Sequence, residues 1–119
     1  SDITPLLIFL MQECGFPVFY GPFVTGLKDT TPRTLTSLQR AINGTLNDLD
    51  IKSKKLTALR SGKANGILVG GCLSMITSSM GTPYELKLPK NAVLFLEDTG
   101  EKLYAIDRML THLKNAGIF

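Results

Sequence analysis

Ser1-Asp2 is the first of three short segments whose side chains could carry covalent or acid–base chemistry. The serine stands immediately ahead of an apolar stretch with helical start signals. If a strand precedes it, the serine lies at a strand-to-helix elbow, and the backbone N–H of Asp2 points to where an oxyanion would form. A plain helix cap is the alternative interpretation. A serine at a literal N-terminus could also use its own amine as the base.

The second segment is Gly70-Gly71-Cys72-Leu73-Ser74, in which Gly-x-Cys-x-Ser follows an apolar run and opens a predicted helix. This is the local pattern of a cysteine nucleophile at an elbow. The alternative is a small buried cysteine with no chemistry. The partner base would have to be His112, the single histidine. His112 stands late in a predicted helix, where a histidine usually complements the helix dipole.

The third segment is the apolar run from Val93 to Leu96, which ends in the carboxylates Glu97 and Asp98. A magnesium site for phosphoryl transfer would also need a phosphate-binding loop. The nearest candidate, Gly62-Lys63-Ala64, lacks the earlier glycine and the Ser/Thr of that loop, which disfavours this interpretation. One carboxylate could instead orient a histidine in a Ser-His-Glu relay. A capped turn before the last helix is the third interpretation.

Helices and strands must alternate to position these segments. Thr4 as N-cap and Pro5 as first helical residue predict a buried helix over 4–14, and Thr31-Pro32 predicts another that ends before Gly44. Further helices are expected over 73–80 and 102–115, the last with an apolar stripe of Leu103, Ile106, Leu110 and Leu113. The expected strands are 16–20, 56–59, 66–69 and 92–96. This alternation is typical of an α/β fold.

Composition excludes several classes of protein. The 119 residues carry a formal net charge of +3, and the one dense basic run, Lys52 to Lys55, contains no aromatic residue, so we expect no nucleic-acid partner. The longest apolar runs fall far short of the ~20 residues of a membrane helix, so we expect no membrane span. Cys14 and Cys72 are far apart, without the spacing of a zinc site or a disulfide framework. We therefore expect no metal and a reducing, cytoplasmic location.

Several motifs occur in a fixed order along the chain. They are Ser1-Asp2-Ile3-Thr4, Tyr20-Gly21-Pro22, Ile67 to Ser74, Gly81-Thr82-Pro83-Tyr84, Leu94 to Asp98 with Glu101, and Tyr104 with Asp107-Arg108-Met109-Leu110. Together they resemble the LD-carboxypeptidase family, which includes muramoyl-tetrapeptide carboxypeptidases and the microcin C immunity hydrolases. The resemblance extends over essentially the whole chain.

The resemblance implies a serine peptidase without a cofactor that cleaves the amide between a diamino acid and a terminal D-alanine. Ser1 would be the nucleophile, Glu97 would orient the base, and the Asp2 amide would hold the oxyanion. Glu101, one helical turn beyond Glu97, could face a cationic group of the peptide, and Cys72 would border the substrate. The family's catalytic histidine lies beyond the present sequence, so we do not expect His112 to act as the catalytic base. A related amide hydrolase acting on a peptide-nucleotide antibiotic stays an alternative, and so does a non-catalytic binding module.

The resemblance also sets expectations for organisation. The polar stretch from Thr45 to Lys55 is the expected boundary between parts of two α/β domains. Residues 1–46 would close a nucleophile domain of flavodoxin-like or amidotransferase-like type, and residues 47–119 would hold a linker and the start of a second domain with the triad acid. As an internal piece, the chain alone is expected to be inactive. The family usually has an asparagine where Cys72 stands. A homodimer is a further expectation.

Overall fold

A computed structural model describes residues 2–45 and 56–119 and divides the chain into two compact units. One unit, called the α/β unit below, joins Ser1–Val18 to Lys63–Phe119. The other unit is Phe19–Gly62. Each unit is described by itself. The expected boundary at residues 46 and 47 falls on the stretch outside the described residues and stays a prediction.

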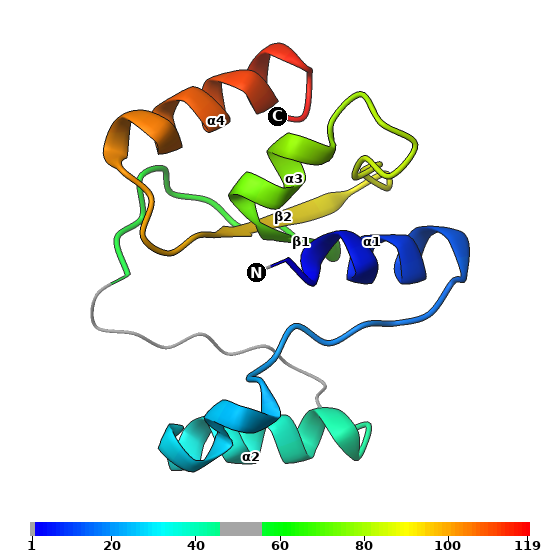
Figure 1. Ribbon diagram of the computed structural model, residues 1–119, viewed down its shortest axis with the longest axis vertical. Coiled ribbons are helices and arrows are strands. Elements are labelled where there is room, and N and C mark those ends of the chain that lie inside the picture. Colours follow the sequence, from blue (N-terminus) through cyan, green and yellow to red (C-terminus); the bar gives the residue numbers. More distant parts are fainter. Residues whose placement is uncertain (1, 46–55) are drawn as a thin grey trace. The chain divides into compact units, whose positions relative to one another are not determined.

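A small parallel sheet lies at the centre of the α/β unit. Strand β1 (Ile67–Cys72) pairs with β2 (Ala92–Glu97), so that Ile67 lies opposite Ala92 and Cys72 lies opposite Glu97 (Figure 1). In the described part of the chain this sheet has two strands. The carboxyl ends of both strands therefore lie next to each other at one edge. This arrangement confirms the α/β class predicted from the alternating pattern.

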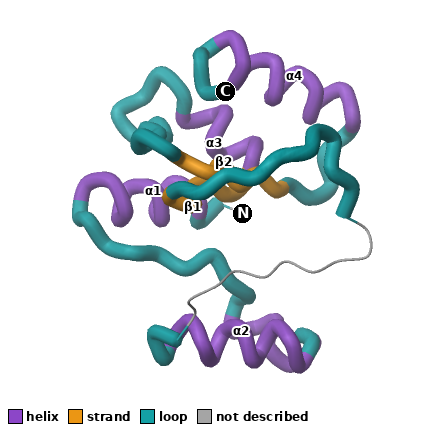
Figure 2. Tube along the Cα trace, turned by 180° about the vertical axis from the view of Figure 1, so that it is seen from behind, coloured by secondary structure: helices purple, strands orange, loops and turns teal. Residues whose placement is uncertain are grey.

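Three helices pack around this sheet. Helix α3 (Leu73–Ser79) starts directly after β1, and α4 (Leu103–Asn115) follows β2 after a short connection (Figure 2). Helix α1 (Thr4–Glu13) contacts both β1 and α3. All three helices begin within one residue of their predicted starts. The parallel strands and intervening helix form the βαβ arrangement that such a sequence pattern predicts.

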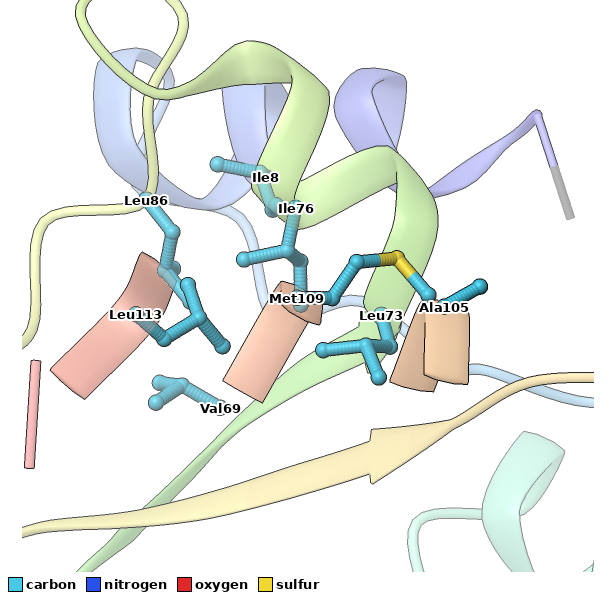
Figure 3. Packing of buried hydrophobic residues seen from close by; sticks show 8 residues of the cluster. All are labelled: Ile8, Val69, Leu73, Ile76, Leu86, Ala105, Met109 and Leu113. Atoms are coloured by element: carbon cyan, nitrogen blue, oxygen red, sulfur yellow. The ribbon is translucent and has the colours of Figure 1, made fainter. Parts of the chain in front are cut away.

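Apolar side chains from all these elements form one core. Figure 3 shows residues of α3 and α4 facing one another over Val69 of β1. The buried members of this core are Ile8, Val69, Leu73, Ile76, Leu86, Ala105, Met109 and Leu113. Burying a side chain such as Leu113 contributes roughly 1.5–3 kcal/mol. This shared core holds α1 in the same unit as the strands that follow it far along the chain.

The buried face of α4 differs from the predicted stripe. Leu103 is 85% exposed and Leu110 is 37% exposed, whereas Ala105, Met109 and Leu113 are buried. The buried positions are four residues apart, as expected for one face of a helix. The small side chain of Ala105 allows α4 to turn this face toward the core. Hydrophobicity alone therefore placed the stripe wrongly at two of its four positions.

Two expected strands are absent from the described residues. Residues 16–20 and 56–59 have no regular secondary structure, and Leu59 is 99% exposed. Pro17 lacks the N–H that a strand needs for its ladder. A strand also needs a second strand to pair with, and an apolar sequence alone does not supply that partner. Both strand predictions are wrong because the described residues provide no pairing strand at these positions.

The unit Phe19–Gly62 is built around α2 (Pro32–Ile42) and the short 3₁₀ helix Val24–Asp29. Thr31 caps α2 as predicted, because the Thr34 N–H donates to Thr31 Oγ1 over 3.2 Å. The described residues of this unit include no buried side chain. Its helix is therefore specified mainly by local signals, the threonine cap and the following proline.

Candidate active site

The turn between β1 and α3 depends on two glycines. Gly70 has a φ of 137° and Gly71 a φ of 148°, a region that side-chain-bearing residues rarely adopt. A Cβ atom on Gly71 would lie 2.8 Å from Thr4 Cγ2. The glycine pair therefore lets the first turn of α1 approach the end of β1. The predicted strand-to-helix elbow is confirmed, although β1 continues through both glycines to Cys72.

Cys72 is 4% exposed and lies at this elbow. Its Sγ is 3.2 Å from Ser74 Oγ and donates to Asp98 Oδ2 over 3.6 Å. Its backbone N–H donates to Thr4 Oγ1 over 3.1 Å. A reactive cysteine needs access to substrate, and here protein atoms surround the thiol. The geometry favours the interpretation of Cys72 as a small buried residue.

Asp98 connects the end of β2 to the start of α3. Its Oδ2 accepts from the Ser74 N–H over 2.9 Å, and its Oδ1 accepts from the Thr99 N–H over 2.8 Å. Partial burial alone raises the pKa of the Asp98 carboxyl, but the hydrogen bonds from Ser74, Thr99 and Cys72 outweigh it and hold the pKa below its usual value. The carboxylate form of Asp98 thus stabilises the turn.

The sequence pattern presented Asp98 only as one of two carboxylates at a strand end, and not as an acceptor for the start of α3. One signal could have found it, because α3 has no side-chain cap of its own at its N-terminal residue Cys72. A helix start without a local cap needs an acceptor from elsewhere in the fold. The carboxylate that ends the neighbouring parallel strand is a natural source of one.

Glu97 is the last residue of β2, is half-buried, and lies opposite Cys72 in the strand register. The structure therefore brings this predicted site residue to the β1–α3 turn. Glu101 is exposed and lies in the connection between β2 and α4. Because α4 begins only at Leu103, the expected helical turn between Glu97 and Glu101 is wrong.

The start of α1 differs from the prediction. Ser1 lies outside the described residues, and Asp2 is exposed in the turn before the helix. The N-cap residue is Ile3, so Thr4 is the first helical residue and not the cap. Its hydroxyl accepts the Cys72 N–H across the fold, because that buried donor needs a partner.

His112 stays apart from the strand ends. It is exposed in the last turn of α4. It also helps to line a cavity of about 320 Å³ whose other walls come from α3, the end of α4 and residues 81–86. That His112 is not the base of a relay with Glu97 stays a prediction.

In residues 2–45 and 56–119, His, Cys, Asp and Glu form no group of three that could hold a metal ion. No helix in that part of the chain combines the length and apolar character needed to cross a bilayer.

Known proteins resemble this chain over nearly its whole length. Residues 65–119 match the LD-carboxypeptidase C-terminal domain. A probable murein peptide carboxypeptidase of Bacillus subtilis is 42% identical over 98% of the chain and 37% of its own length. The murein tetrapeptide carboxypeptidase of Pseudomonas aeruginosa is 31% identical over 95% of the chain and 39% of its own length. The microcin C7 self-immunity protein MccF of Escherichia coli is 26% identical over 100% of the chain and 43% of its own length.

The chain thus spans well under half the length of these relatives. The relatives include proteins of both kinds named by the motif resemblance, a murein tetrapeptide carboxypeptidase and a microcin immunity protein. The C-terminal domain match covers β1, β2, α3 and α4, which together carry Cys72 and Glu97. The ordered motifs, the domain match and the relatives agree: residues 65–119 match the LD-carboxypeptidase C-terminal domain, and the chain as a whole is similar to proteins of that family.

Proposed function

We propose that this chain supplies part of a serine-type LD-carboxypeptidase that removes the terminal D-alanine from murein tetrapeptides. One observation carries the proposal. The Thr4–Cys72 hydrogen bond attaches the first turn of α1 to the end of β1, where Glu97 is the residue opposite Cys72. The segment that follows Ser1 and the strand end with the candidate acid therefore meet at one edge of the sheet.

Each step of the reaction has a candidate group. The Ser1 hydroxyl attacks the carbonyl carbon of the amide, and its proton passes to a histidine from outside the present sequence. The backbone N–H of Asp2 donates to the oxyanion. The histidine then protonates the departing amine of D-alanine, and water hydrolyses the acyl-enzyme. Glu97 orients the histidine and stabilises its charged form.

The substrate site is proposed beside this edge. Glu101 is exposed in the β2–α4 connection, so its carboxylate is accessible to the cationic amino group of a diamino acid. Cys72 borders the site through its backbone, because its side chain is buried. The proposed partner is thus a murein tetrapeptide, and no cofactor enters the mechanism.

Finer organisation is also part of the proposal. Residues 1–46 belong to a flavodoxin-like or amidotransferase-like nucleophile domain, and residues 47–119 to a linker and a second domain. The start of the C-terminal domain match at residue 65, shortly after the polar stretch 45–55, supports this division. In the structure, however, α1 packs in one compact unit with residues 63–119, so the proposed division is one of sequence and not of compact units. A homodimer and a cytoplasmic location stay predictions.

A second candidate is a related amide hydrolase that detoxifies a peptide-nucleotide antibiotic. The similarity of the full chain to the microcin C7 self-immunity protein favours it as the alternative. Both candidates use the same nucleophile and acid. They differ in the peptide that the site accepts, so substrate comparison separates them.

The test measures D-alanine release from a murein tetrapeptide by the intact protein. Ser1→Ala should lower turnover by about 10⁴-fold or more, because neighbouring oxyanion donors cannot replace the nucleophile. Ser78→Ala is the matched control, since Ser78 is exposed in α3 and donates only to the Met75 carbonyl. Ser78→Ala should keep wild-type turnover.

Three results would contradict parts of this proposal. Equal turnover of the wild type and Ser1→Ala would exclude Ser1 as the nucleophile. Hydrolysis of a peptide-nucleotide antibiotic without D-alanine release would favour the second candidate. Activity toward neither substrate would favour a non-catalytic binding module.

A further inference from the structure

Thr4 has an exposed fraction of 0%, which is unusual for a threonine in the first turn of a helix. A threonine in that place ordinarily caps its own helix or faces solvent. Here its Oγ1 accepts the N–H of Cys72, a residue 68 positions along the chain, over 3.1 Å. The side chain therefore serves a distant segment and not the local helix.

The rest of the Thr4 side chain is also constrained. A Cβ atom on Gly71 would lie 2.8 Å from Thr4 Cγ2 and 2.9 Å from Thr4 Oγ1. Real Cβ atoms do not approach other atoms so closely, so only glycine permits this contact. Both branches of the Thr4 side chain therefore make contacts: the hydroxyl accepts a hydrogen bond, and the methyl group packs against β1.

The same turn is held from the other side by Asp98. The carboxylate accepts the Ser74 N–H and the Cys72 thiol, and it follows Glu97 directly in sequence. The turn 72–74 therefore has two attachments. Thr4 connects it to the start of α1, and Asp98 connects it to the end of β2.

The far end of α1 is anchored separately. The Gln12 side-chain amide donates to the Glu85 carbonyl over 3.1 Å and accepts from the Lys87 N–H over 2.7 Å. Removing the Thr4 acceptor would consequently free the first turn while the last turn stays attached. The expected movement is a local shift of the helix start.

We propose that Thr4 is a positioning residue of the active site, which sets the place of Ser1 and Asp2 relative to Glu97 through the backbone of the β1–α3 turn. The inference rests on the proposed function. Thr4 touches neither substrate nor the reacting atoms in this scheme. Its effect arises because a displacement of about 1 Å in reacting groups can lower a rate by about a hundredfold.

Kinetics of the intact protein with a murein tetrapeptide test this inference. Thr4→Val keeps the shape of the side chain and removes the acceptor, so kcat should fall about tenfold to a hundredfold with KM changed less than about threefold. Thr4→Ser keeps the acceptor and should restore kcat to within about threefold of the wild type. A role in packing alone predicts no such rescue, because serine lacks the methyl group.

Thr77→Val is the matched control. Thr77 is half-buried in α3 and donates to the Leu73 carbonyl over 2.8 Å, so the substitution also removes one threonine hydrogen bond. We expect its melting temperature to fall slightly and its kcat to stay at the wild-type value. This separates loss of a hydrogen bond in general from loss of the one that holds the start of α1.

The outcomes separate this inference from the function on which it rests. Wild-type kcat in folded Thr4→Val, or a kcat reduced tenfold in Thr4→Ser, would overturn the role of Thr4 and leave the peptidase proposal standing. If Thr4→Val does not fold, the kcat of Thr4→Ser decides alone. A wild type that releases no D-alanine would overturn the peptidase proposal, and the inference with it.

Discussion

The starts of α1 and α3 each have a candidate nucleophile close before them, but their environments differ. Each helix is preceded by a small residue that could act as a nucleophile, Ser1 or Cys72. At the start of α3 the Cys72 side chain is 4% exposed and its thiol contacts Ser74 and Asp98. At the start of α1, Asp2 is exposed and Ile3 is 38% exposed. The start of α3 is thus a buried joint formed by Thr4, Cys72 and Asp98, whereas Asp2 and Ile3, just before Thr4, are accessible.

The β1–α3 elbow shows that this pattern specifies backbone geometry and not access. Access is decided by what packs against the elbow. At α3 the packing groups are Thr4 and Asp98, which come from opposite ends of the sequence. Before α1, by contrast, Asp2 and Ile3 are exposed to solvent. The predictions below test how strongly the joint at α3 depends on each of its parts.

Gly71→Ala should have the largest effect on this joint. The new Cβ would lie 2.8–2.9 Å from two atoms of Thr4, and φ at this position is 148°. Thr4 cannot move aside without losing its bond to Cys72. Overpacking and backbone strain together should cost about 2–4 kcal/mol of folding free energy. The melting temperature of the intact protein measures this cost.

Gly26→Ala is the control for this substitution. A Cβ at Gly26 would meet no atom within 4 Å. Its melting temperature should change by the equivalent of less than about 0.5 kcal/mol, as for an ordinary surface substitution. Equal melting temperatures of the two variants would show that the contact between Gly71 and Thr4 does not hold the joint.

The elements of the joint were largely predictable from the sequence, and its connections were not. Proline, glycine and apolar runs placed α1, α3, β1 and β2 within a few residues of their observed bounds. They also placed Cys72 and Glu97 at strand ends. Thr4 was predicted as a helix cap because capping rules consider only residues within one turn, whereas its partner is 68 positions away.

The wrong predictions have the same origin. The stretch 16–20 has apolar residues suited to a strand, but strand formation requires a partner that local sequence does not reveal. Likewise, Leu103 and Leu110 were assigned to the core by hydrophobicity, whereas the neighbouring elements select Ala105 and Met109. Hydrophobicity indicates which residues could be buried, but packing against neighbouring elements determines which of these residues are buried.

Asp98→Asn should have a smaller effect that depends on pH. The folded state favours the charged form of Asp98, since its pKa lies below the usual value. Its contribution is therefore fully present above the pKa of the unfolded chain, and it is lost as pH falls through the lower pKa of the folded state. At neutral pH, Asp98→Asn should cost about 1 kcal/mol, because a neutral amide makes weaker hydrogen bonds than a carboxylate.

Melting temperatures between pH 7 and pH 3 measure this dependence. The difference between the wild type and Asp98→Asn should be constant near neutral pH and should shrink below about pH 4, where aspartate ordinarily titrates. Asp107→Asn is the control, because Asp107 is exposed on α4. A difference for Asp98→Asn that persists unchanged at pH 3 would contradict the role of the charge.

Cys72→Ala should have the smallest effect of the three, although Cys72 stands at the centre of the joint. The bond to Thr4 comes from the backbone N–H of Cys72, which alanine also provides. Alanine loses only a thiol whose contacts, at 3.2 Å to Ser74 Oγ and 3.6 Å to Asp98 Oδ2, are weak hydrogen bonds. We expect a loss of less than about 1 kcal/mol in stability and less than about tenfold in turnover. Cys14→Ala, at the exposed cysteine, is the control and should match the wild type.

A serine-directed covalent probe provides the decisive measurement in Cys72→Ala. Its adduct should stay on the peptide that contains Ser1, because the joint still holds the start of α1. An adduct found in the wild type on the peptide that contains Cys72, and lost in Cys72→Ala, would reverse the assignment of the two helix starts.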